Sequence, residues 1–146
     1  MTTALNGEQI ARKINKASPG AVVAADKAAV VVTGESLFKV AKFLKNTPAL
    51  DFNYLADLAA VDYTDYFEVV YHLVSLAHNH SLVLKTRCYD RDKPVVPSLT
   101  ALWRSGDFME REAYDLMGIV FDGHPNLKRL LLWEGFVGHP LRRDYL

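Results

Sequence analysis

The sequence predicts an α+β fold: a two-layer sandwich of one mixed, mostly antiparallel sheet with helices on one face, followed by an extended C-terminal arm. Amphipathic helical segments are interspersed among short strands in the order α-β-β-α-β-β-β-α, which is typical of such a sandwich. After residue 121 the apolar periodicity is lost and short turns follow. We therefore expect an α+β domain over residues 1–121 and a docking arm over residues 122–146, within a single structural domain overall.

The first half of the chain supplies two helices and a hairpin. Asn6 can cap a helix that ends before Pro19. Short apolar runs over residues 21–25 and 28–33 then predict a β-hairpin. Residues 35–45 place apolar side chains on one helical face and lysines on the other, which predicts a second helix.

Three longer strands and two helices are expected next. Alternation of apolar and polar residues predicts strands over residues 54–62, 66–77 and 81–89. Ser98 can cap a short helix that runs to residue 104. A further helix is predicted over residues 107–117, because Gly118 is a natural C-terminal cap.

Composition excludes several classes of function. The 146 residues hold 17 basic and 17 acidic side chains, so the net charge does not favour binding to nucleic acid. The aromatic residues are also not interleaved with the basic ones as base stacking requires. The single cysteine, Cys88, cannot form an intramolecular disulfide or a thiolate cluster, and we expect a small buried side chain there. With no secretory signal or spanning segment, we expect a soluble chain whose membrane contact comes only through partners.

The helix predicted over residues 107–117 brings a carboxylate to its apolar face. At about 100° per residue, Glu112 falls inside the apolar arc and Glu110 lies on its flank. A core-facing carboxylate is costly unless a cation or several donors meet it. The nearest cations in sequence belong to the arm: Arg129, Arg142 and Arg143. We expect one of them to bind Glu112 and hold the arm on this helix; the alternative is that Glu112 reaches solvent.

No pattern in the chain supports independent catalysis. Glu110 and Glu112 point about 200° apart on a helix, so they cannot act on one substrate. Arg111 and Asp115 are expected as an ion pair on the face opposite the apolar stripe. The chain has no glycine-rich phosphate loop, nucleophile elbow or iron–sulfur cysteine set.

Three histidines, His72, His78 and His80, raise the question of a metal site. No cysteine or carboxylate completes a known ligand spacing with them, and Asn79 indicates the tip of a hairpin. We therefore expect solvated turn histidines and no metal.

Two histidine–proline pairs lie in the arm, His124-Pro125 and His139-Pro140. Proline pushes the preceding histidine into an extended conformation, so each imidazole has a defined direction. We expect both rings to hydrogen-bond backbone carbonyls and hold the shape of the arm. A proton relay is the alternative, since histidine titrates near neutral pH.

The last quarter of the chain carries one long pattern. It reads E-R-E-x-x-D-x-x-G-I from Glu110, H-P at His124, L-x-R-L-L from Leu127 and G-H-P-L-R-x-D-Y from Gly138. This pattern resembles the C subunit of respiratory complex I (NADH-quinone oxidoreductase), the bacterial counterpart of the mitochondrial 30-kilodalton subunit. The resemblance extends more loosely over the whole chain, including L-x-D-x-x-x-V-D from Leu55. It implies a two-layer α+β domain followed by an extended arm.

The resemblance also implies a function. It points to a cofactor-free subunit of a proton-translocating NADH:quinone oxidoreductase, peripheral on the cytoplasmic side of the cell membrane. Flavin and iron–sulfur clusters are then expected in partner subunits, and NADH and quinone act at the level of the complex. The expected partners are the 49-kilodalton-type subunit and neighbouring subunits of the quinone module. The alternative is the equivalent subunit of a related membrane complex that uses ferredoxin, a deazaflavin or a hydrogenase module as electron source.

By the same resemblance, fourteen positions are expected to form the surface that docks on the partner. They are Glu110, Arg111, Glu112, Asp115, Gly118, His124, Pro125, Arg129, His139, Pro140, Arg142, Arg143, Asp144 and Tyr145.

Overall fold

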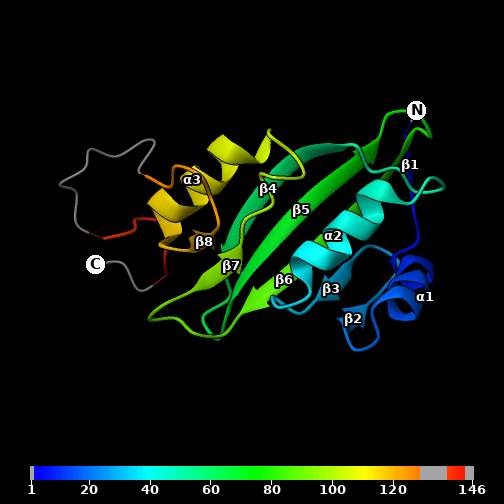
Figure 1. Ribbon diagram of the computed structural model, residues 1–146. Helices are drawn as coiled ribbons and strands as arrows, with labels where there is room; N and C mark the ends of the chain where they lie inside the picture. The colour runs from blue at the N-terminus through cyan, green and yellow to red at the C-terminus, as the bar shows by residue number, and fades with distance from the viewer. Residues whose placement is uncertain (1, 129–137, 144–146) are drawn as a thin grey trace.

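A computed structural model describes residues 2–128 and 138–143 of the chain (Figure 1). Its elements in chain order are β1 (Thr3–Ala4), α1 (Gly7–Ala17), β2 (Val22–Ala25), β3 (Val30–Val32), α2 (Leu37–Asn46), β4 (Tyr54–Asp62), β5 (Phe67–Ser75), β6 (His80–Cys88), β7 (Val95–Pro97), α3 (Gly106–Met117) and β8 (Val120–Asp122).

One six-stranded sheet forms the centre of the molecule. Its main order is β2-β3-β6-β5-β4, and the short β1 pairs with one end of β6. Neighbours are antiparallel except for β3 and β1, which both run parallel to β6. The predicted mixed, mostly antiparallel sheet is therefore confirmed, as is the hairpin of β2 and β3.

A single apolar core joins the three helices to one face of this sheet. Alternate side chains of β5, from Phe67 to Leu73, are fully buried in it. The buried stripes of α1, α2 and α3 belong to the same cluster, so the predicted two-layer α+β architecture is confirmed. Asn6 caps α1 as expected, because its side-chain oxygen accepts the backbone N–H of Glu8 at 2.9 Å.

The segment after β6 differs from the expectation. The helix predicted from Ser98 to residue 104 is wrong, since these residues form turns. The turns are held from outside: the Trp103 indole N–H donates to the Phe52 carbonyl, and Lys45 donates to the Leu102 carbonyl. Local backbone bonds also form, from the N–H groups of Leu102 and Trp103 to the Leu99 carbonyl, but they do not continue into a regular helix.

A second sheet, which was not predicted, pairs the strand before residues 98–119 with the strand after them. Strands β7 and β8 pair in parallel, with Val95 opposite Val120 and Pro97 opposite Asp122. Figure 1 shows β7, β8 and α3 together at the end of the molecule away from the N-terminus. Among the residues that the structure describes, no helix combines the length and apolar character needed to cross a membrane.

Candidate functional site

Helix α3 presents a buried carboxylate to the turns before it. Glu110 is fully buried, and its two oxygens accept the Ser98 hydroxyl at 2.6 Å and the Leu99 backbone N–H at 2.8 Å. Burial raises the pKa of Glu110, and the two hydrogen bonds oppose that rise. The hydroxyl of Ser98 is thus used to bind this carboxylate and not to cap a helix.

Glu112 does not face the core, and the alternative expectation, that it reaches solvent, is confirmed. Glu112 is exposed, while Gly106, Glu110, Ala113 and Met117 form the buried stripe at helical spacing. Counting the stripe from Gly106, which lies inside the helix, would have placed Glu110 in it. Gly106 gave weak evidence for the start of the buried stripe, because glycine is more typical of the end of a helix.

The proposed link from Glu112 to the arm is not observed for the two arginines that the structure describes. Arg142 donates through Nε to the Met117 carbonyl at 2.6 Å and through Nη2 to the Arg91 carbonyl at 3.2 Å. Arg143 binds Asp62. The third candidate, Arg129, lies outside the described residues. The arm is therefore attached through arginine, but to backbone carbonyls and to an aspartate of the sheet.

Asp62, at the end of β4, is the centre of that attachment. Its carboxylate accepts hydrogen bonds from both terminal nitrogens of Arg91, at 2.6 and 2.9 Å. It also accepts hydrogen bonds from the backbone N–H groups of Arg143 and Thr64, at 2.8 Å each. The Nε of Arg143 donates to the Asp62 carbonyl at 2.7 Å. These donors, Arg91 first, hold the pKa of Asp62 well below its usual range.

An aromatic ring completes this cluster. The guanidinium carbons of Arg91 and Arg142 lie 4.5 and 4.9 Å from the ring centroid of Phe67, within the range of cation–π attraction. We call Asp62, Phe67, Arg91, Arg142 and Arg143 the arm latch. Sequence reasoning found the two arm arginines but missed the other three residues. Asp62 entered only as part of a family pattern, because nothing local marks a residue whose partners lie far along the chain.

The two histidine–proline pairs behave as predicted. Nε2 of His124 lies 3.2 Å from the Asp107 carbonyl oxygen and 3.0 Å from its carboxylate, and Nδ1 accepts the Asn126 N–H. Nδ1 of His139 lies 2.9 Å from the Asp115 carbonyl oxygen. Both imidazoles therefore tie the chain after α3 back onto that helix, directly before Pro125 and Pro140.

Gly118 makes room for the returning arm. Its φ of 78° is left-handed, as expected for the cap of α3. A Cβ at this position would lie 2.7 Å from Cδ2 of His139 and 3.1 Å from Nη2 of Arg142. The absence of a side chain is thus required twice, by the backbone angle and by the close approach of the arm.

The remaining predicted site residues are placed as follows. Asp115, expected on the face opposite the apolar stripe, is fully buried, and Arg111 is half-buried. Arg111 donates through Nε to the Lys128 carbonyl at 3.3 Å. Asp144 and Tyr145 lie outside the described residues.

The histidines of the β5–β6 hairpin bind backbone oxygens. Nε2 of His78 lies 2.8 Å from the Pro48 carbonyl oxygen, and Nε2 of His80 lies 2.7 Å from that of Leu50. Within residues 2–128 and 138–143, no group of three histidine, cysteine or acidic side chains is placed to hold a metal ion. Cys88 is half-buried.

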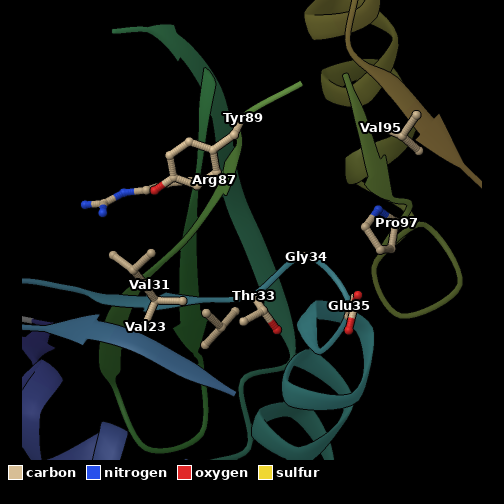
Figure 2. A pocket seen from close by; sticks show the side chains of 10 residues that line it. Val23, Val31, Thr33, Gly34, Glu35, Arg87, Tyr89, Val95 and Pro97 are labelled. Atoms are coloured by element: carbon tan, nitrogen blue, oxygen red, sulfur yellow. The ribbon is translucent and has the colours of Figure 1, made fainter. Parts of the chain in front are cut away.

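A hollow of about 580 Å³ is lined by residues between Val23 and Pro97, and none of its lining residues belongs to the arm. Figure 2 shows Val23 and Val31 on one side of it and Val95 and Pro97 on the other, with the Arg87 guanidinium directed away from the latter pair. Arg87 is held by the buried carboxylate of Glu68, with Nε 3.1 Å from Oε2. The hollow is therefore an open apolar surface without a convergent set of polar groups.

Comparisons with known proteins agree with this architecture. Residues 30–146 match the family described as "Respiratory-chain NADH dehydrogenase, 30 Kd subunit". The chain is 46% identical over 125 residues to the C subunit of the NADH-quinone oxidoreductase from Cupriavidus pinatubonensis, covering 80% of this chain but 63% of that protein. It is 40% identical over 148 residues to the corresponding protein of a Roseiflexus species, covering 97% of this chain and 84% of that protein.

A solved structure shares the fold at lower identity. A chain of the membrane-bound sulfane sulfur reductase, an archaeal respiratory membrane complex, superposes with a TM-score of 0.68 and 22% identity, covering 86% of this chain and 75% of that one. The family match covers most of the sequence, and the two relatives are 40% and 46% identical over most of it. The chain belongs to the family of the 30-kilodalton subunit of respiratory-chain NADH dehydrogenase.

Proposed function

We propose that this chain is a non-catalytic subunit of a membrane-bound, proton-translocating NADH:quinone oxidoreductase. In this role it binds the 49-kilodalton-type subunit through α3 and the C-terminal arm and braces the quinone-proximal module. Flavin and iron–sulfur clusters belong to partner subunits, and the chain is peripheral on the cytoplasmic side of the cell membrane.

The family and the names of the relatives support this proposal. Each of the two bacterial relatives compared above is named as part of an NADH-quinone oxidoreductase. The chain spans 63% of the length of the Cupriavidus protein and 84% of that from Roseiflexus, so the function of the whole proteins is carried over as a proposal.

The arm latch is the observation that carries the proposal. The described end of the arm, residues 138–143, is fixed against the sheet, α3 and the loop after β6 by hydrogen bonds of Arg142 and Arg143. The arm itself still exposes Leu141, whose surface is 59% accessible. The backbone N–H of Leu141 donates to the Leu116 carbonyl at 3.0 Å. An exposed apolar residue on a hydrogen-bonded backbone suits a docking site, because less conformational entropy is lost on binding.

The proposal is tested by affinity purification of the tagged chain from gently solubilised membranes, with mass spectrometry of the co-purified proteins. We expect a 49-kilodalton-type subunit together with flavin-bearing NADH-module subunits. The same partner without the NADH module would assign the chain to a related complex with another electron donor. Recovery of the chain alone, even after crosslinking before solubilisation, would overturn the proposal.

A matched pair of variants links the result to the arm. Arg142→Ala removes the contacts to α3, the loop and Phe67, so we expect less assembled complex with unchanged turnover per complex. Arg12→Ala removes an exposed arginine of α1 and should change neither. Equal abundance of complex with lost turnover in Arg142→Ala would contradict a docking role.

A further inference from the structure

A second, smaller groove runs between the edge strand β4 and helix α3. It encloses about 260 Å³, less than the roughly 300–1,000 Å³ of sites that bind small molecules. Space of this size suits one or two side chains of another protein. The apolar residues that line it are Leu58, Ala59, Ala60, Met109, Ala113, Leu116, Met117 and Leu141.

Small side chains and a bulge open this groove. The β4–β5 register shifts between Leu55 and Asp57, which adds a residue to the edge strand and turns Asp57 outward. Beyond the bulge, Ala59 and Ala60 leave space beside α3 that larger strand residues would fill. The groove is thus a consequence of the local sequence of β4.

The charged residues that line the groove have one sign. Asp57 of β4 and Glu112 of α3 are both exposed, and no lysine or arginine lines the groove among the described residues. Across the described part of the chain, neither carboxylate has an ion pair or a side-chain hydrogen bond. The larger hollow differs, because Glu35 and Arg87 give it both signs.

The groove is continuous with the arm. Leu141, which precedes the two latch arginines, supplies part of its lining. The strand that forms one wall ends at Asp62, the centre of the latch. The position of the arm therefore determines whether the groove is complete.

We propose that this groove binds an apolar segment of a partner subunit that carries a lysine or arginine, with the cation between Asp57 and Glu112. The inference rests on the proposed docking function and names the surface and the chemistry of what it receives. Exposed apolar area supplies contact, and the two unpaired carboxylates select for a cationic partner. In this proposal Glu112 binds the cation of the partner and does not hold the arm.

Charge reversal tests the proposal in the assembled complex. Glu112→Lys and Asp57→Lys each place a cation against the expected one, so recovery of the partner per tagged chain should fall roughly tenfold or more. Glu35→Lys is the matched control, since Glu35 is an exposed acid that lines the other hollow. We expect it to leave recovery unchanged. Urea unfolding of the three purified chains checks that none has lost stability.

Carbodiimide crosslinking of the wild-type complex identifies the occupant. This reagent joins a carboxylate directly to a contacting amine, so a lysine of another subunit should be linked to Asp57 or Glu112. An arginine partner would give no link but would still produce the loss on charge reversal. Links only to this chain or to a second copy of it would overturn the proposal, as would unchanged recovery in both reversal variants.

The two proposals fail in different ways. If the wild-type chain recovers no partner subunit, the proposed function fails. If the wild type and both reversal variants recover the same partner equally, the docking function stands and the groove is not its site.

Discussion

Asp62 and Arg91 form a two-pronged ion pair, in which the two terminal nitrogens of the guanidinium bind the two carboxylate oxygens at 2.6 and 2.9 Å. Asp62 ends strand β4, and Arg91 lies in the loop that leads to β7. The pair therefore fixes that loop on the sheet. The Arg91 carbonyl in turn accepts a hydrogen bond from Nη2 of Arg142, so the loop also supports the arm.

Replacing this carboxylate should destabilise the fold. Asp62→Asn loses the charge that Arg91 requires, and hydrogen bonds to charged groups contribute about 1.5–3 kcal/mol. We expect the free energy of unfolding, measured in urea, to fall by about 2–3 kcal/mol. Asp65→Asn, at an exposed turn residue, should change it by less than about 0.5 kcal/mol. Equal effects of the two substitutions would show that the ion pair adds no stability.

The pH dependence of the same variant has a definite sign. The pKa of Asp62 is lowered in the folded chain, so the carboxylate stabilises the fold above the unfolded pKa of about 4. That stability is lost as the pH falls below this value. Wild type and Asp62→Asn should therefore converge in unfolding free energy from about pH 5 downwards. A constant gap between about pH 6 and about pH 3, a range that spans the unfolded pKa, would contradict the lowered pKa.

Glu110 should show the opposite dependence. Burial raises its pKa in the folded chain, so its contribution is full below the unfolded value of about 4.3 and is lost as the pH rises through the folded pKa. Glu110→Gln stays neutral and retains an acceptor for Ser98 or Leu99. The stability of wild type relative to this variant should fall as the pH rises from about 4 upwards. Urea titrations at a series of pH values measure it, and a rising difference would show that ionised Glu110 is favoured.

The left-handed glycines allow strain to be separated from arm contact. Gly118→Ala should cost about 1–2 kcal/mol from the backbone angle and should also displace His139 and Arg142. Gly123→Ala has a similar positive φ of 88°, but a Cβ there meets no atom within 4 Å. Hydrogen exchange should therefore quicken over residues 138–143 in the first variant only. Equal exchange in both would show that the arm does not depend on the space at Gly118.

One buried hydroxyl is expected to be dispensable. Tyr71 is fully buried, and its hydroxyl has no hydrogen-bond partner among the described residues. Burial, and then the nearby charge of Glu110, raise its pKa, so the group remains neutral. Tyr71→Phe removes an unpaired polar atom and should raise the unfolding free energy by up to about 1 kcal/mol. A loss of stability would reveal a partner for the hydroxyl.

The sequence was sufficient for the parts of the fold that local periodicity controls. The alternation along β5 and the apolar stripe of α2 each predicted the buried face correctly. The same approach failed at residues 98–104, where capping chemistry at Ser98 favoured a helix. There the deciding partners, Phe52 and Glu110, lie elsewhere in the chain.

The candidate site was predictable to a similar extent. The histidine–proline pairs constrain their own backbone, so the direction of each imidazole followed from two adjacent residues. The arm latch did not, because Asp62 meets its partners only after the sheet and the loop have formed. The buried stripe of α3 begins at Gly106. Because the prediction did not count Gly106 in the stripe, it took Glu112 for the core-facing carboxylate, whereas Glu110 is the buried one.

The long separation within the latch also sets an order of events during synthesis. Arg143 follows Asp62 by 81 residues, whereas β4, β5, β6 and Arg91 are all translated before it. At roughly 5–20 residues per second, Arg143 is added on the order of 4–16 s after Asp62. In that interval Arg91 alone can neutralise the aspartate. The strands of the sheet can thus pair before Arg143 is made, and the contact between Asp62 and the arm forms only after they have been translated.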